Sequence, residues 1–173
     1  MKQIIWIFGT STAGKNTFVH RVCSDQRLRE LLGWGSRKVA ASTASLTYIG
    51  STKDDPFVAA RDNIFTEVPA LLLNNDCVLI KWQFVDSEAN RLERLKAAIP
   101  EAEHSIICLS APIEELIERV KTRPSWKGTV DERAYMAWEK GAVGAALEQM
   151  ASYFPIEYRD SSSSGQYQVT NEQ

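Results

Sequence analysis

Short apolar runs alternate with longer amphipathic segments along most of this 173-residue chain. Apolar runs bounded by turn residues are typical of buried strands, whereas apolar residues that recur every three or four positions indicate helices. The pattern predicts strands at residues 3–8, 37–41, 77–83, 104–109 and 155–159, and helices at 15–32, 57–74, 87–97, from 112 onward and at 129–153. Strands that alternate with helices favour right-handed βαβ units and a parallel sheet.

A glycine-rich segment joins the first predicted strand to the first predicted helix. It reads Gly9-Thr10-Ser11-Thr12-Ala13-Gly14-Lys15-Asn16-Thr17 and has the spacing G-x-x-x-x-G-K. Between a strand and a helix, such a loop turns its backbone N–H groups toward phosphate oxygens, and the helix N-terminus adds partial positive charge. Lys15 is expected to reach the outer phosphates of a nucleoside triphosphate. The sequence therefore predicts a phosphate-binding loop; the alternative is a plain turn that binds nothing.

The residue after the lysine departs from the usual form of this motif. A Ser or Thr whose hydroxyl binds Mg²⁺ commonly follows the lysine, but here Asn16 stands in that position and Thr17 comes next. Gly14-Lys15-Asn16-Thr17 resembles the Gly-Lys-Gly-Thr of adenylate-kinase-like families and the Gly-Lys-Asp-Thr of some phage-type nucleotide kinases. The resemblance implies that Thr17 contacts the inner phosphate and that Asn16, or water, holds the metal.

A second informative segment follows the fourth predicted strand. The stretch from Leu116 to Pro124 resembles the passage into the lid of nucleotide, gluconate and shikimate kinases, and Ser125–Gly128 would be a short lid tip. Arg119 and Arg123 are four residues apart and therefore share one helix face. The resemblance implies that Arg119 lies near the adenine or the phosphates and that Arg123 clamps the transferring phosphoryl group. The competing interpretation is a basic helix C-terminus that complements the helix dipole.

The acceptor and metal sites are marked less clearly. In the kinases that this chain resembles, the hydroxyl-rich stretch around Thr43 would face the acceptor, and Arg61 would clamp an anionic substrate with its planar fork. A surface loop and an ordinary exposed arginine are the competing interpretations. The third predicted strand ends in Lys81-Trp82-Gln83, where many P-loop proteins carry a metal-orienting acid. Asp86, a little further on, is therefore the candidate metal ligand beside Asn16.

Composition and charge exclude several other classes of protein. The net charge of −2 gives no general basic field for nucleic acid, and no apolar run approaches the length of a membrane span. Cys23, Cys77 and Cys108 form no Cys-x-x-Cys pair, which favours reduced cysteines in a cytoplasmic protein. His20 and His104 stand apart from one another, so neither is expected to bind a metal.

The resemblance covers residues 2–160 and implies a three-layer α/β P-loop NTPase fold. We expect five parallel strands in the order 2-3-1-4-5, in a single domain over residues 1–160, with a loop or tail at 161–173. The implied activity is an ATP-dependent phosphotransferase that uses Mg²⁺ and moves the γ-phosphate to a small-molecule acceptor, first of all a nucleotide or nucleoside. The alternatives are a kinase of a hydroxylated metabolite or an antibiotic, and a nucleotide-binding sensor that transfers nothing. The chain is expected to be a monomer or a homodimer.

Overall fold

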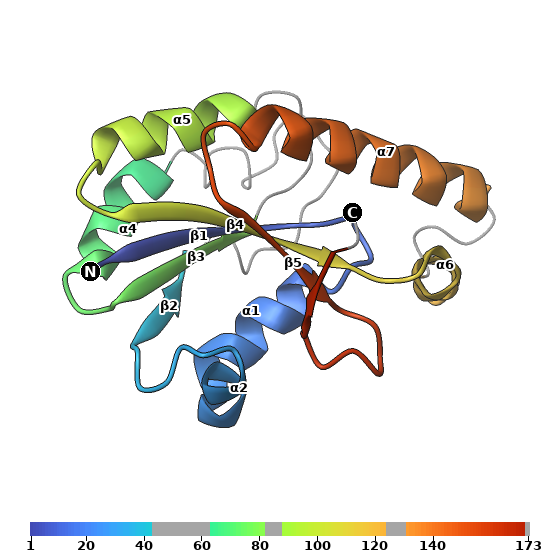
Figure 1. The fold of residues 1–173 in the computed structure, drawn as a ribbon, viewed down its shortest axis with the longest axis horizontal. Coiled ribbons are helices and arrows are strands. Elements are labelled where there is room, and N and C mark those ends of the chain that lie inside the picture. The colour runs from blue at the N-terminus through green and yellow to red at the C-terminus, as the bar shows by residue number, and fades with distance from the viewer. Residues whose placement is uncertain (43–62, 82–87, 124–130, 172–173) are drawn as a thin grey trace.

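The computed structural model describes residues 1–42, 63–81, 88–123 and 131–171, which form a sheet covered by helices on both faces (Figure 1). The strands are β1 (Gln3–Phe8), β2 (Val39–Ala41), β3 (Cys77–Lys81), β4 (Glu103–Ser110), β5 (Ile156–Asp160) and β6 (Val169–Thr170). The helices are α1 (Lys15–Ser24), α2 (Gln26–Leu31), α4 (Ile64–Leu72), α5 (Glu88–Ala98), α6 (Ile113–Lys121) and α7 (Glu132–Met150). Within these ranges no helix is long and apolar enough to cross a bilayer.

The strands lie in the order β2-β3-β1-β4-β5-β6, and the first five are parallel. The predicted order of the five parallel strands is therefore confirmed. The segment expected to be a loop or tail from residue 161 adds a sixth strand, because Val169 and Thr170 pair antiparallel with Arg159 and Tyr158. This pairing satisfies backbone groups that the edge of β5 would otherwise expose. The C-terminal segment is thus part of the sheet.

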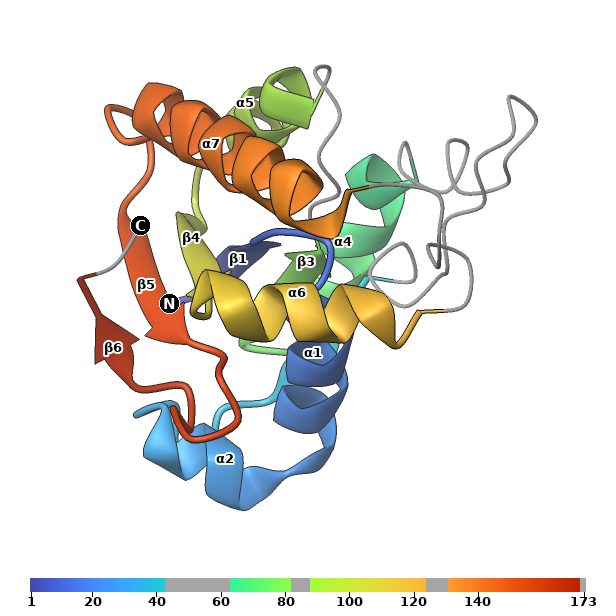
Figure 2. The same cartoon turned by 90° about the vertical axis from the view of Figure 1, so that its right-hand side faces the viewer.

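Alternate residues of the central strand β1 belong to two separate apolar clusters, one on each face of the sheet. Ile4, Trp6 and Phe8 of β1 face α4, α5 and α7, whereas Ile5 and Ile7 face α1, α2 and α6. A parallel strand that is covered on both faces has no polar side, which explains the unbroken apolar run that the sequence shows. Figures 1 and 2 show the resulting three layers, with β1 in the middle of the sheet.

The single helix predicted for residues 15–32 is wrong, since the chain forms two helices there. Asp25 has an extended backbone and ends α1, and its carboxylate accepts a hydrogen bond from the amide of Leu28 at 3.2 Å. Aspartate is favoured at such N-cap positions because it satisfies an otherwise unpaired amide at a helix start. The predicted helix over 57–74 is described from Ile64 to Leu72, and its first residues lie outside the described ranges.

Candidate functional site

The glycine-rich loop leaves the carboxyl end of β1, between the ends of β3 and β4. Gly9 and Gly14 have φ values of 147° and 86°, a region that favours glycine. A Cβ at Gly9 would also lie 2.8 Å from the carbonyl oxygen of Leu109, so this position cannot take a side chain without a shift. β1 pairs with β3 on one side and with β4 on the other, and the strand order of the sheet reverses between β1 and β4, so the loop lies at this reversal. This is where ligands bind in open α/β sheets.

Lys15 lies across the loop that precedes it. Its ammonium donates hydrogen bonds to the carbonyl oxygens of Gly9 at 2.8 Å and Thr10 at 2.6 Å, and the residue is only 6% exposed. Burial lowers the pKa of Lys15 to about 8, against the opposing effect of the Glu139 carboxylate. The ammonium therefore occupies the loop at an energetic cost that an anion would relieve.

Both predicted lid arginines contact this loop. Arg119 of α6 donates to the carbonyl oxygen of Thr12 at 3.0 Å and to that of Ser161, just after β5, at 2.7 Å. Its guanidinium also pairs with Glu115 at 2.8 Å. Arg123 donates to the carbonyl oxygen of Ser11 at 2.9 Å. In Figure 2, α6 crosses in front of the end of the sheet.

Glu139 of α7 is a site residue that the sequence analysis missed. Its carboxylate accepts hydrogen bonds from the amide of Ser11 at 2.5 Å and from the hydroxyl of the same residue at 2.9 Å. Glu139 is 5% exposed and lies between Met136 and Val143 on the buried stripe of α7. An acidic residue at an apolar position of an amphipathic helix is the signal that could have revealed it.

Lys81 ends β3 beside the loop strand, opposite Ile7 of β1. Its ammonium donates to the side-chain oxygen of Asn16 at 2.6 Å, and the residue is 5% exposed. Burial, and secondarily the charge of Arg123, lowers the pKa of Lys81 to about 8. The charge of Lys81 in turn contributes to the lowered pKa of Lys15. A cation thus stands where the P-loop proteins that this chain resembles carry an acid.

The predicted metal and acceptor residues are only partly described. Asn16 lies at the loop as expected, but its amide oxygen is engaged by Lys81. Asp86, Thr43 and Arg61 lie outside the described residues, so their assignments stay predictions. Within the described ranges, no three or more His, Cys, Asp or Glu side chains gather in a way that could hold a metal ion.

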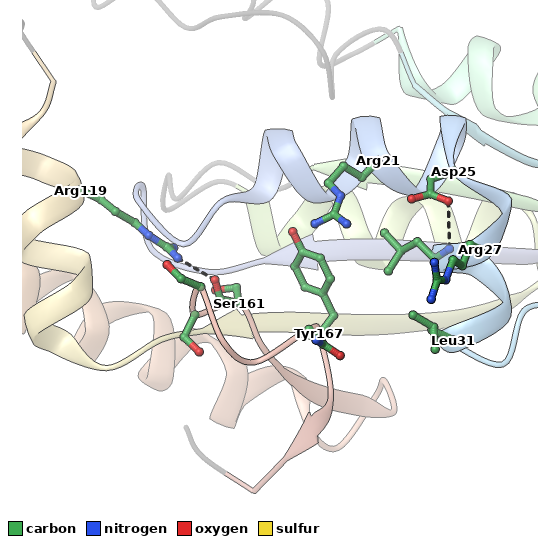
Figure 3. Close-up of a pocket in the computed structure, with 11 residues that line it drawn as sticks. Arg21, Asp25, Arg27, Leu31, Arg119, Ser161 and Tyr167 are labelled. Atoms are coloured by element: carbon green, nitrogen blue, oxygen red, sulfur yellow. Dashed lines mark hydrogen bonds between the residues drawn. The ribbon is translucent and has the colours of Figure 1, made fainter.

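A cavity of about 610 Å³ opens beside the loop, between α1, α2 and the segment that joins β5 to β6 (Figure 3). Arg119 and Ser161 lie at one end of it, and Arg21 lies next to Tyr167 in the middle. The guanidinium carbon of Arg21 is 5.6 Å from the centre of the Tyr167 ring. The cavity is lined by Arg21, Asp25, Arg27, Leu28, Leu31, Arg119, Ser161, Ser162, Ser163, Gln166 and Tyr167. Its volume falls in the range of small-molecule sites.

Arg119 links this cavity to the phosphate loop, because the same guanidinium lines the cavity and bonds Thr12. The ring of Tyr167, which lines the cavity, packs edge-on against Phe18 with 4.9 Å between the ring centres, and this contact fixes its position. Arg119 is thus the residue that the cavity and the loop share, and Tyr167 is the aromatic residue of the cavity.

No protein-family model matches the chain, and the search of curated proteins found no match. Among solved structures, the chain is similar to a candidate kinase from Chloroflexus aurantiacus J-10-fl, with 18% identity and a TM-score of 0.52 over 94% of this chain and 89% of that chain. It is also similar to a chain of the Pnkp1/Rnl/Hen1 RNA repair complex, with 18% identity and a TM-score of 0.51, over 86% of this chain and 46% of that chain. A gluconokinase from Sinorhizobium meliloti 1021 matches with 16% identity and a TM-score of 0.48, over 93% of this chain and 83% of that chain.

These similarities establish that the chain has the fold of P-loop kinases, as the glycine-rich loop predicted.

Proposed function

We propose that this protein is a kinase that transfers the γ-phosphate of ATP to a small-molecule acceptor. One observation carries the proposal: Lys15, Arg119 and Arg123 all donate hydrogen bonds to carbonyls of a single glycine-rich loop. Phosphoryl transfer depends chiefly on positioning and on neutralising the charge of the phosphates. A loop ringed by cations, in a fold shared with P-loop kinases, supplies both.

Each cation has a place in the proposed reaction. Lys15 would exchange the carbonyls of Gly9 and Thr10 for oxygens of the β- and γ-phosphates, next to the amides at the start of α1. Arg123 is exposed and lies on the solvent side of the loop, from which it would bind the transferring phosphoryl group. A bond forms between the acceptor oxygen and the γ-phosphorus, and the bond from that phosphorus to the β–γ bridging oxygen breaks. ADP then leaves with the electron pair of the broken bond. A hydroxyl acceptor releases its proton to water in this step, whereas an ionised phosphate acceptor has no proton to lose.

The cavity is the proposed site of the nucleoside part of ATP. It begins at Arg119, one residue contact away from the loop, and is lined by Tyr167. Aromatic faces stack on bases without regard to their identity. This arrangement supports the expectation that the segment after β5 passes near the adenine.

Mg²⁺ is the metal that this type of kinase uses to neutralise nucleotide phosphates. The described residues do not fit a protein-held ion, because the amide oxygen of Asn16 accepts a hydrogen bond from the ammonium of Lys81. Asp86 stays a predicted ligand outside the described residues. No step of the proposed mechanism therefore passes through a metal held by these side chains.

A nucleotide or nucleoside is the acceptor that we propose first, on the resemblance of Gly14-Lys15-Asn16-Thr17 to nucleotide kinases. A hydroxylated metabolite or an antibiotic is the second candidate, and a sensor that binds ATP without transfer is the third. The sensor is favoured over either kinase by one observation: Asn16 and Lys81 stand where a metal-binding hydroxyl and a metal-orienting acid are expected, and they bond one another.

Labelled ATP, incubated with the protein and a pooled panel of nucleotides, sugars and aminoglycoside-like alcohols, tests the proposal. A labelled acceptor is the expected result, and stoichiometric ATP binding without transfer would favour the sensor. Lys15→Met should weaken ATP binding by about 10- to 100-fold, because it removes a charge-assisted contact to the phosphates. Lys96→Met is the matched control, since Lys96 is an exposed lysine of α5 that bonds Tyr153. Equal ATP affinity in the two variants would overturn the proposal.

A further inference from the structure

The end of β3 and the start of α1 present an arrangement that the phosphate loop alone does not require. The amide oxygen of Asn16 follows Lys15 directly, at the position whose side chain commonly binds Mg²⁺ in this motif. The partner of that oxygen is the ammonium of Lys81, 2.6 Å away. Mg²⁺ requires hard oxygen ligands, and an ammonium group that is hydrogen-bonded to such an oxygen repels the metal ion.

The buried ammonium of Lys81 lies near two other cations of the site, Lys15 and Arg123. The carboxylate of Glu139 favours the protonated form of Lys15, whereas the charges of Lys81 and Arg123 oppose it. Arg123 likewise opposes the protonated form of Lys81. A polyanion that binds among these three cations stabilises their charged forms together, above all those of the buried Lys15 and Lys81.

We propose that the ammonium of Lys81 takes the place of a protein-held Mg²⁺ at this site and binds the outer phosphates of a nucleoside triphosphate, so that the protein binds ATP without a divalent metal. This inference rests on the proposed function and specifies how its site recognises the triphosphate. A lysine suits the role, because it is a compact point charge with three donors that can serve Asn16 and phosphate oxygens at once.

Calorimetric titration of ATP, in MgCl₂ and separately in EDTA, distinguishes this role from an ordinary structural contact. The wild-type protein should bind ATP with affinities within about threefold of one another in the two conditions. Lys81→Met should weaken binding in EDTA by about 10- to 100-fold, the range of a charge-assisted hydrogen bond. Mg²⁺ should restore much of this loss, since the variant leaves the oxygen of Asn16 open to the ion.

Two further variants make the test specific. Lys81→Asp places a carboxylate at the end of β3, so ATP binding should become strictly dependent on Mg²⁺. Lys96→Met, at the opposite end of the sheet, should behave as the wild type in both conditions. Thermal melting shows which variants fold. If one of Lys81→Met and Lys81→Asp fails to fold, the other still provides the comparison with the wild type.

The outcomes separate the two proposals. Wild-type binding that is more than about 10-fold tighter with Mg²⁺, and a Lys81→Met variant with the same ratio, would overturn the role of Lys81 and leave the kinase proposal intact. If the wild-type protein binds ATP in neither condition, both the role of Lys81 and the kinase proposal are overturned.

Discussion

The carboxylate of Glu139 holds both the amide and the hydroxyl of Ser11, at 2.5 Å and 2.9 Å. These residues are 128 positions apart in the chain, and the contact places an anionic group at the glycine-rich loop, which is proposed to bind phosphates. The carboxylate therefore compensates part of the charge of Lys15 while no phosphate is bound, and it repels a phosphate that arrives.

Glu139→Gln should strengthen the binding of ATP at pH 7 by about 3- to 10-fold. The amide oxygen of glutamine can still accept from Ser11, whereas the negative charge that opposes the triphosphate is lost. Fluorescence or calorimetric titration measures the change. Glu148→Gln changes an exposed carboxylate of the same helix and should leave the affinity as it is. Weaker binding in Glu139→Gln would show instead that the carboxylate orients the loop for its ligand.

Substitution of Arg119 should mainly lower stability, whereas substitution of Arg123 should mainly lower catalysis. Arg119→Met removes hydrogen bonds to Thr12 and Ser161 and should lower the free energy of unfolding by about 1–2 kcal/mol. Arg123→Met removes one exposed contact and should change stability by less than about 0.5 kcal/mol. Its kcat should nevertheless fall about 10³-fold with little change in KM, as expected for an arginine that acts on the transferring group. Unaltered kcat in Arg123→Met would reduce this residue to a surface contact.

The affinity for ATP should fall as the pH rises above 8. Burial lowers the pKa of both Lys15 and Lys81 to about 8, and a bound triphosphate raises both values again by favouring the ammonium forms. Below pH 7 both ammonium groups are already present, so binding takes up no proton there. At pH 8 and above, binding must take up protons, and each lysine should cost about 10-fold in affinity per pH unit. Titration in buffers of different ionisation enthalpy counts the protons directly, and no uptake at pH 8 would contradict the assignment of these lysines.

Gly165→Ala should distort the wall of the cavity without harming the phosphate loop. A Cβ at this position would lie 2.2 Å from the carboxyl carbon of Asp160, whose carboxylate accepts from the amide of Ser162. We expect a loss of stability of about 1–3 kcal/mol and weaker ATP binding, with the affinity for inorganic tripolyphosphate retained. Gly141→Ala is the matched control. Nothing lies within 4 Å of a Cβ there, and alanine should stabilise α7 by about 0.5–1 kcal/mol.

The features that the sequence revealed are local ones. The loop at residues 9–17 is a contiguous motif, and the unbroken apolar runs of β1 and β3 identify buried parallel strands from composition alone. The strand order follows from the family resemblance and is confirmed. The sequence also contained a signal for the break between α1 and α2, because Asp25 is a residue type that favours helix starts. The apolar spacing on both sides of Asp25 nevertheless suggested one continuous helix.

The contacts that the sequence did not reveal join distant segments. Glu139 reaches Ser11 only because α7 packs over the end of the sheet, and no local pattern encodes that distance. Lys81 was visible as a departure from the expected acid, but its partner Asn16 follows from the pairing of β3 with β1. The strand at Val169–Thr170 is too short to show a period of its own, and the unpaired edge of β5 determines it.

The two walls of the cavity come from opposite ends of the chain. One wall is α1 and α2, which immediately follow the phosphate loop, and the other is the short segment after β5, folded back by β6. Under the proposed function, changes to a handful of residues in the segment after β5 would alter which base the protein accepts and would leave the loop that is proposed to hold the phosphates unchanged. Substrate choice and phosphate chemistry can in this way diverge separately, by selection or by design.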